Sequence, residues 1–289
     1  MKIHNSLALL VSCLKDWEKL PSEKEFIERY AKPMEKDAGD FFEEHYSSLQ
    51  SLDWSAYRNE AISLSPEREE LRVRKHLSDI ENLFGFKLEG DIILCGAFTA
   101  MDGYARFDRG THQVFLGVDE SHGRGKYLDV LITHELTHVA RESRPEVWEG
   151  FGLNPKMTQE EFTENQPVIE HLMSEGFSCA VSEILVPGQD PWGYAYQDRE
   201  KLAFIVKNGF AVDRAIQKEL RNPDGDYGHL YRSSTYTPRQ PIFAHYVWAW
   251  QWVKQLLRDQ MSGDPKKLVA RCSKEFMEDA LKFELKKIR

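Results

Sequence analysis

The apolar residues of the first 88 positions recur mainly at helical spacing. The earliest stripe places apolar side chains three or four positions apart on one helix face, at Leu7, Leu10, Val11, Leu14 and Trp17. Further along, Ser65 followed by Pro66 is typical of a first helical turn, and the pattern extends this helix to about Leu83. The sequence therefore predicts that residues 1–88 form a helical N-terminal region.

The spacing between apolar residues changes from a helical to a strand-like pattern near Asp91 and returns to a helical pattern near residue 126. Short apolar or alternating runs separated by turn-forming residues predict two or three strands, at Ile92–Cys95, Tyr104–Phe107 and Gln113–Val118. Helical spacing then returns and predicts further helices, at residues 126–142, 166–186, 194–208, 211–221, 242–258 and from 264 onward. Residues 148–164 are predicted to be an acidic loop. We therefore expect an α+β fold that is mostly helical, with a small β-sheet before the helix that begins near residue 126.

That helix carries the chain's most informative motif. Lys126–Ala140 contains His134-Glu-Leu-Thr-His138, the pattern H-E-x-x-H, and it is apolar on most sides, which is typical of a buried helix. Residues four apart stand one turn above each other, so His134 and His138 present two imidazoles to one point, a pairing that suits Zn²⁺. Glu135 lies beside them and does not need to ligate. The alternative is that both histidines are core residues with satisfied hydrogen bonds.

Catalytic zinc usually takes three protein ligands, so the motif calls for a third. Glu142 lies on the same helix, and three ligands from one straight helix cannot surround a metal, which favours a supporting role for Glu142. Glu175 lies on a separate predicted helix, and Gly176 beside it permits close helix packing. We expect Glu175 to be the third ligand, with Glu183 and His171 as alternatives.

Composition and charge narrow the partners and the compartment. The net charge of −9 argues against nucleic acid as the main partner, because phosphate binding requires a basic surface. No run reaches the ~18 apolar residues of a membrane span, and the short apolar run near the N-terminus is better explained as an amphipathic helix than as a signal peptide. Four widely spaced cysteines indicate free thiols in a reducing compartment: Cys13, Cys95, Cys179 and Cys272. We expect a cytoplasmic protein.

The motifs together resemble a known group of enzymes. His134–His138 followed by Met173–Ser178 resembles the glutamate-ligand zincin metallopeptidases. More narrowly, it is similar to the YjaZ-like bacterial family of zinc-dependent proteases, a domain without an assigned function, over about residues 90–258. The family's late helix motif corresponds to Tyr246–Trp250. This chain departs from the family at Ser178, where alanine is usual, and at Ala249, where glycine is usual.

The resemblance implies that residues 89–289 form a zincin-like metallopeptidase domain that hydrolyses peptide bonds in a peptide or protein substrate. It implies Zn²⁺ held by His134, His138 and Glu175, with Glu135 as the general base for a zinc-activated water. It further implies Tyr246 as the donor that steadies the oxyanion, and three other residues are alternatives for that role: His229, Tyr231 and His245.

Two other classes of function remain open at this point. The first is a zinc-stabilised binding or chaperone-like protein without turnover, although a structural zinc site requires four ligands and no general base. The second is a metal-free helical regulator. The oligomeric state is left open as well.

Overall fold

The computed structural model confirms the α+β class. It describes residues 1–34, 46–98, 101–121, 125–222, 225, 227–231 and 243–285. Helices dominate the described chain, and they surround a four-stranded sheet whose order is β1-β2-β4-β3. The strands are β1 (Lys2–Asn5), β2 (Asp91–Cys95), β3 (Gly103–Asp108) and β4 (Thr111–Gly117).

The three predicted strands are confirmed, and the sheet contains one more. β1 pairs in parallel with β2, so the prediction that residues 1–88 are helical throughout is wrong at its first residues. β1 is short and mostly polar, which leaves no periodic signal, and it forms through long-range contacts. The N-terminal amine donates to Leu88 O at 2.7 Å, and His4 Nε2 lies 2.8 Å from Asp91 Oδ1. The proposed domain boundary near residue 88 stays a prediction.

The helices of the N-terminal region follow the apolar pattern. They are α1 (Leu7–Asp16), α2 (Glu23–Phe26), a π-helical turn η1 (Ile27–Ala31), α4 (Tyr46–Leu49), α5 (Trp54–Ala61) and α6 (Pro66–Phe84). Pro66 occupies the first turn of α6 as predicted, although the Ser65 side chain makes no capping hydrogen bond. α6 ends at Gly85, whose φ of 82° is the left-handed conformation that favours glycine.

The middle of the chain contains the motif helix and shorter helices. These are α7 (Val118–Ser121), α8 (Tyr127–Glu142), α9 (Pro145–Glu149), α10 (Gln159–Asn165) and α11 (Val168–Leu185). α8 and α11 confirm the predicted helices. The predicted loop at 148–164 is wrong in part, because Pro145 starts α9 and Thr158 with Glu161 forms a capping box that starts α10. Such short helices carry little periodicity.

The C-terminal part is helical. It contains α12 (Pro191–Tyr194), α13 (Arg199–Lys207), α14 (Gly209–Arg221), α15 (Gly228–Tyr231), α16 (Ala244–Gln260), η3 (Pro265–Lys267), η4 (Ser273–Phe276) and α17 (Met277–Lys282). The helix predicted for 194–208 is interrupted at residues 195–198, where Asp198 caps a new helix by accepting from Lys201 N. Ile184 continues the apolar spacing of α11, which indicates a buried position, but 46% of its surface is exposed.

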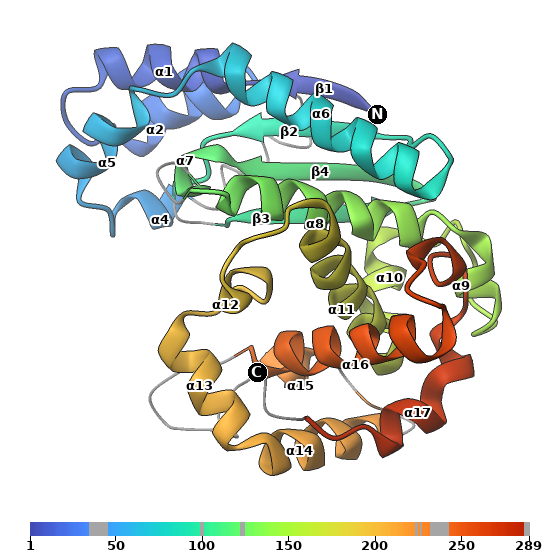
Figure 1. Cartoon of the computed structure of the whole chain (residues 1–289). Helices are drawn as coiled ribbons and strands as arrows, with labels where there is room; N and C mark the ends of the chain where they lie inside the picture. The colour runs from blue at the N-terminus through green and yellow to red at the C-terminus, as the bar shows by residue number, and fades with distance from the viewer. Residues whose placement is uncertain are drawn as a thin grey trace.

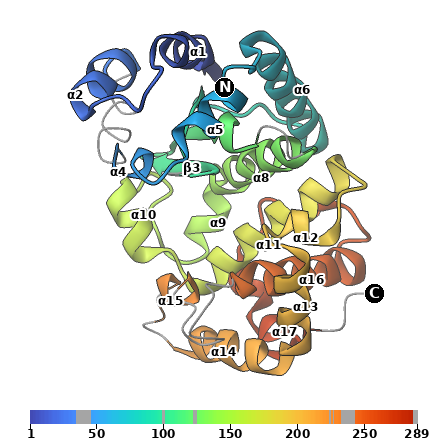
Figure 2. The same ribbon diagram turned by 90° about the vertical axis from the view of Figure 1, so that its left-hand side faces the viewer.

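α8 and α11 lie where two layers of the molecule meet. α6 and α8 pack side by side on one face of the sheet, and α1 and α2 lie on the other side of the sheet (Figure 2). α11, α16, α14 and α17 form a helical layer below the sheet and α8 (Figure 1). Gly176 does permit a close approach, but to α16: an added Cβ would lie 2.3 Å from Ala249 O. Within the described ranges, no helix is both long and apolar enough to cross a membrane.

Candidate metal centre

His134, His138 and Glu175 converge in the structure, as the sequence predicts. α8 supplies the two histidines from successive turns, and α11 packs across α8 and supplies the carboxylate. The two Nε2 atoms are 3.0 Å apart, and Glu175 Oε2 lies 3.1 Å from His134 Nε2 and 3.5 Å from His138 Nε2. All three side chains are buried. The three residues therefore form a group that could hold a metal ion.

The dimensions of this triangle fit a metal ion of the size of zinc. Ligand atoms bound at ~2.0–2.1 Å in a tetrahedron lie about 3.3–3.4 Å from one another. The observed separations of 3.0, 3.1 and 3.5 Å fall around that value. The donor set of two imidazoles and one carboxylate, with a fourth position free for water, is typical of catalytic zinc.

Groups behind His138 orient its ring toward the triangle. Its Nδ1 atom lies 2.7 Å from Ser174 Oγ, and that hydroxyl donates in turn to Glu142 Oε1 at 3.1 Å. Because the hydroxyl proton goes to Glu142, Ser174 accepts from Nδ1–H, so Nε2 is the ring nitrogen that faces the triangle and can bind a metal when it gives up its proton. Glu142 also lies 3.5 Å from His112 Nε2, so it supports the site and does not join the triangle.

The charges of the cluster favour a bound cation. Burial would lower the pKa of His138, but the carboxylates of Glu175 and Glu142 outweigh it and raise that pKa well above the ordinary value. Burial opposes ionisation of Glu175, yet the positive charge of His138 holds the pKa of Glu175 well below its usual range. Burial lowers the pKa of His134 to about 4, so this ring is neutral near pH 7. A metal cation would replace the proton that these carboxylates attract.

Glu135 stands beside the triangle on the side that faces β3. Burial, reinforced by the charges of Glu175 and Glu142, raises the pKa of Glu135 to about 8. β3 approaches closely because Gly103 has no side chain: an added Cβ would lie 3.1 Å from Glu135 Oε1 and 2.7 Å from Leu131 Cδ1. Glu135 is thus a buried carboxyl group with a raised pKa next to the candidate metal-ligand group, which consists of His134, His138 and Glu175. This arrangement is suited to proton transfer.

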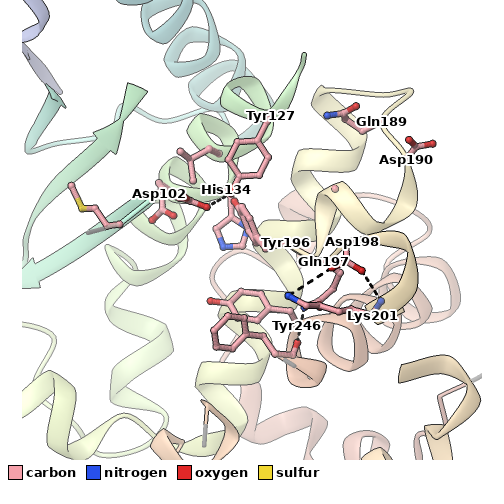
Figure 3. Close-up of a pocket in the computed structure, with 16 residues that line it drawn as sticks. Asp102, Tyr127, His134, Gln189, Asp190, Tyr196, Gln197, Asp198, Lys201 and Tyr246 are labelled. Atoms are coloured by element: carbon pink, nitrogen blue, oxygen red, sulfur yellow. Dashed lines mark hydrogen bonds and ion pairs between the residues drawn. The ribbon is translucent and has the colours of Figure 1, made fainter. Parts of the chain in front are cut away.

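A cleft of about 1260 Å³ opens next to His134 and Glu135. One wall comes from β3 and α8, and the facing wall comes from α12, the turn after it, α13 and α16 (Figure 3). A second cavity of about 250 Å³ reaches the same centre from the side of Tyr104 and Gln159. Gly103 and Tyr246 line both cavities, so the metal-ligand group lies between two spaces.

The alternative third ligands lie elsewhere. Glu183 accepts hydrogen bonds from Trp250 Nε1 at 3.1 Å and from Lys254 Nζ at 2.8 Å, so it pairs with α16. His171 is buried and stacks on Tyr227, with ring centroids 4.5 Å apart, and it is not part of the triangle.

The structure describes the side chains of two of the four candidates for the oxyanion donor, Tyr246 and His245. The Tyr246 hydroxyl donates to Glu175 Oε1 at 3.1 Å, so this residue touches the ligand group directly. His245 is buried next to Tyr246, with ring centroids 4.7 Å apart. The side chains of His229 and Tyr231 lie outside the part of the chain that the structure describes.

One aromatic residue at the site escapes the sequence pattern. Tyr196 falls in the interruption between α12 and α13, and its ring centroid lies 4.9 Å from that of His134. Periodicity assigned it to a helix, and only its neighbourhood in the fold marks it.

We compared the chain with protein-family models, with curated proteins and with solved structures, and none of these comparisons found a match.

Proposed function

We propose that the protein is a zinc-dependent metallopeptidase of the zincin type, as the resemblance to the YjaZ-like family suggests. One observation carries the proposal: a buried His-His-Glu triangle of the size of a zinc site has a buried glutamate of raised pKa beside it, and both adjoin a large cleft. His134, His138 and Glu175 would hold the zinc. When bound, zinc would lower the pKa of a water molecule to ~7 and polarise a carbonyl group.

Glu135 performs the proton transfers in this proposal. It takes a proton from the attacking water and returns it to the leaving amine as the C–N bond breaks. A pKa raised to about 8 supports this role, because a group whose pKa lies near neutral pH can both accept and release a proton. The Glu135 side chain is packed against Gly103 of β3 and also lines the cleft, so a substrate in the cleft can reach it.

The position of β3 supports an extended peptide as the substrate. β3 lies at one edge of the sheet, because it pairs with β4 and is last in the strand order. Its first residues, Gly103, Tyr104 and Ala105, line the cavities next to Glu135. A peptide that added to this edge through main-chain hydrogen bonds would pass the metal-ligand group.

The site is less compatible with a zinc-stabilised protein that has no turnover. A structural zinc is closed by four protein ligands, whereas the metal-ligand group found in the described residues has three. We also place the enzyme in the cytoplasm, and the four buried free thiols are consistent with that proposal.

The test combines metal analysis with a cleavage screen. Purified protein should contain about one zinc per chain, and His134→Ala and Glu175→Ala should lose it. Glu135→Gln should keep the zinc while peptide cleavage, followed by mass spectrometry of a peptide library, falls by about 10²–10⁴-fold.

Each step can contradict the proposal separately. A native protein that takes up no zinc when zinc is supplied excludes the metal site. A zinc-loaded protein that cleaves no peptide excludes the peptidase, and a fully active, zinc-loaded Glu135→Gln protein removes Glu135 from the mechanism.

A further inference from the structure

Tyr196 is held at the edge of the cleft by three aromatic rings. Its ring meets His134 at 86°, Tyr127 at 87° and Tyr246 at 78°, with centroids 4.9, 5.9 and 5.9 Å away. Figure 3 shows these four rings gathered beside the cleft. Edge-to-face contacts on three sides leave the Tyr196 ring little freedom to turn. The ring therefore has a defined position next to a proposed metal ligand, His134.

The backbone at Tyr196 is strained, and its neighbours hold the strain in place. Its φ is 52°, in the left-handed region that residues other than glycine rarely adopt. Gln197 Nε2 donates to Ala195 O at 3.1 Å and to Phe243 O at 3.3 Å, which ties the turn to the start of α16. Strain of this kind persists where the surroundings impose it, and it is concentrated at functional sites.

The hydroxyl group of Tyr196 is a hydrogen-bond donor for which the described residues provide no acceptor. Its oxygen is buried and has no hydrogen-bond partner among the described residues, although the residue as a whole is partly exposed and lines the cleft. An unpaired buried hydroxyl reduces stability, which calls for an explanation in a folded protein.

The neighbouring tyrosines differ from Tyr196 in this respect. Tyr246 donates to Glu175 Oε1, and Tyr127 donates to Asp102 Oδ2. Of these three hydroxyls, that of Tyr196 is the one with no acceptor in the described part of the molecule.

We propose that Tyr196 is the donor that stabilises the oxyanion during peptide hydrolysis, an inference that rests on the proposed function. As the water oxygen bonds to the scissile carbon, the C=O π electrons move onto the carbonyl oxygen, and Glu135 takes the water proton. The Tyr196 hydroxyl donates a hydrogen bond to that negative oxygen and keeps its proton. When the carbonyl re-forms, the C–N bond breaks and Glu135 protonates the amine. Tyr246 then serves to hold Glu175 in place.

The test replaces single hydroxyls in the zinc-loaded protein. Tyr196→Phe should lower kcat by about 10²–10³-fold with KM and zinc content unchanged, because the lost hydrogen bond exists only in the transition state. The same variant should melt at the same or a higher temperature, because it removes an unpaired buried hydroxyl. Tyr127→Phe is the stability control, and it should melt at a lower temperature because Asp102 loses its donor.

Tyr246→Phe separates the two tyrosines. It should weaken zinc binding by about 10–100-fold, because Glu175 loses a supporting hydrogen bond, and added zinc should restore its kcat. A wild-type kcat in Tyr196→Phe, or a melting temperature lowered as much as in Tyr127→Phe, would overturn the proposal. A kcat loss in Tyr246→Phe that zinc does not restore would assign the donor to Tyr246.

Binding of inorganic phosphate distinguishes failure of this inference from failure of the proposed function. Calorimetry of the zinc-loaded protein should show phosphate bound about 10-fold or more weakly by Tyr196→Phe, because phosphate is a tetrahedral anion that uses the same donor. If the native protein cleaves no peptide, the proposed function fails. If the native protein and Tyr196→Phe then bind phosphate with equal affinity, the role of the Tyr196 hydroxyl as an anion donor fails as well. No phosphate binding by the native protein overturns the donor directly.

Discussion

α8 and α11 are joined by two buried charged clusters that are built differently. At one, Arg141 and Glu170 are fully buried and form a two-pronged ion pair, with Nε–Oε1 and Nη2–Oε2 distances of 2.7 Å each. Arg141 also donates to Leu268 O and Arg271 O at 3.0 Å each. At the other, His134, His138 and Glu175 direct three acceptor atoms at one point beside a cleft.

The difference is where the positive charge comes from. The Arg141 cluster contains its own cation, a guanidinium whose donors match the carboxylate and two carbonyl groups. The histidine cluster has acceptors facing each other, and a proton or a metal ion has to supply the positive charge. One cluster is therefore built to hold the helices together, and we propose that the other is built to exchange what it binds.

The largest effect on stability should come from the Arg141 cluster. Glu170→Gln leaves the buried guanidinium without its counter-charge, and we expect a loss of about 3–5 kcal/mol of unfolding free energy in chemical denaturation. Zinc content of the protein that remains folded should not change. A double change to Arg141→Met and Glu170→Leu should recover much of the loss, and a Glu170→Gln protein of native stability would contradict this assignment.

The reciprocal substitution lies five positions along the same helix. Glu175→Gln removes a proposed ligand, so we expect zinc affinity to fall by more than ~100-fold in a competition titration. Stability without zinc should fall less than in Glu170→Gln, because His138 can release its proton when Glu175 no longer pairs with it, whereas Arg141 keeps its charge. If Glu175→Gln kept its zinc and lost stability like Glu170→Gln, the two clusters would both be structural.

A smaller effect should follow from the support behind His138. Ser174→Ala removes the hydroxyl between His138 Nδ1 and Glu142, so the ring is held less firmly, and zinc affinity should fall by about 10–100-fold. The same competition titration measures it. Ser182→Ala is a matched control on α11, since Ser182 donates to Val130 O away from the metal-ligand group. Equal zinc affinity in Ser174→Ala and the native protein would contradict the role given to Ser174.

Lower pH should act differently on the histidine cluster and on a third charged cluster, in which Arg72 and His76 contact Asp129 of α8. The carboxylates raise the pKa of His138, so protons compete with zinc, and zinc affinity should fall as pH falls through that raised pKa. Asp129 behaves in the opposite way: burial opposes its ionisation, but hydrogen bonds from Arg72 and His76 outweigh it and hold the pKa of Asp129 below its ordinary value. The stability that Asp129 contributes is therefore present above pH ~4 and lost as pH falls below that value.

A pH titration of zinc release and of unfolding free energy checks both signs. Zinc should leave at a higher pH than that at which the Asp129 contribution disappears. Asp129→Asn should lower stability by about 2 kcal/mol at pH 7 and by clearly less at pH 2, because the contribution disappears only as pH falls through the lowered pKa of Asp129. An equal loss at both values of pH would show that charge is not the cause.

The metal-ligand group could be predicted from the sequence because the geometry of a single helix places two of its three residues, His134 and His138. The four-residue spacing of His134 and His138 suffices to bring two imidazoles together on any helix. Glu175 was favoured because it lies on a separate helix and is followed by a glycine, although Gly176 contacts α16 and not α8. Glu183 offered a similar apolar setting, and its pairing with Lys254 of α16 was not visible in the pattern.

What the sequence determined by itself is periodic: the long helices α6, α8, α11 and α16, the strands β2, β3 and β4, and the H-E-x-x-H pair. Periodicity reports which face of a local element is buried, so it needs no knowledge of partners. Only the tertiary structure decided the strand β1, the break before α13 and the position of Tyr196. These depend on contacts between distant parts of the chain, which supply the hydrogen bonds for a polar strand and hold a tyrosine in a conformation its own backbone disfavours.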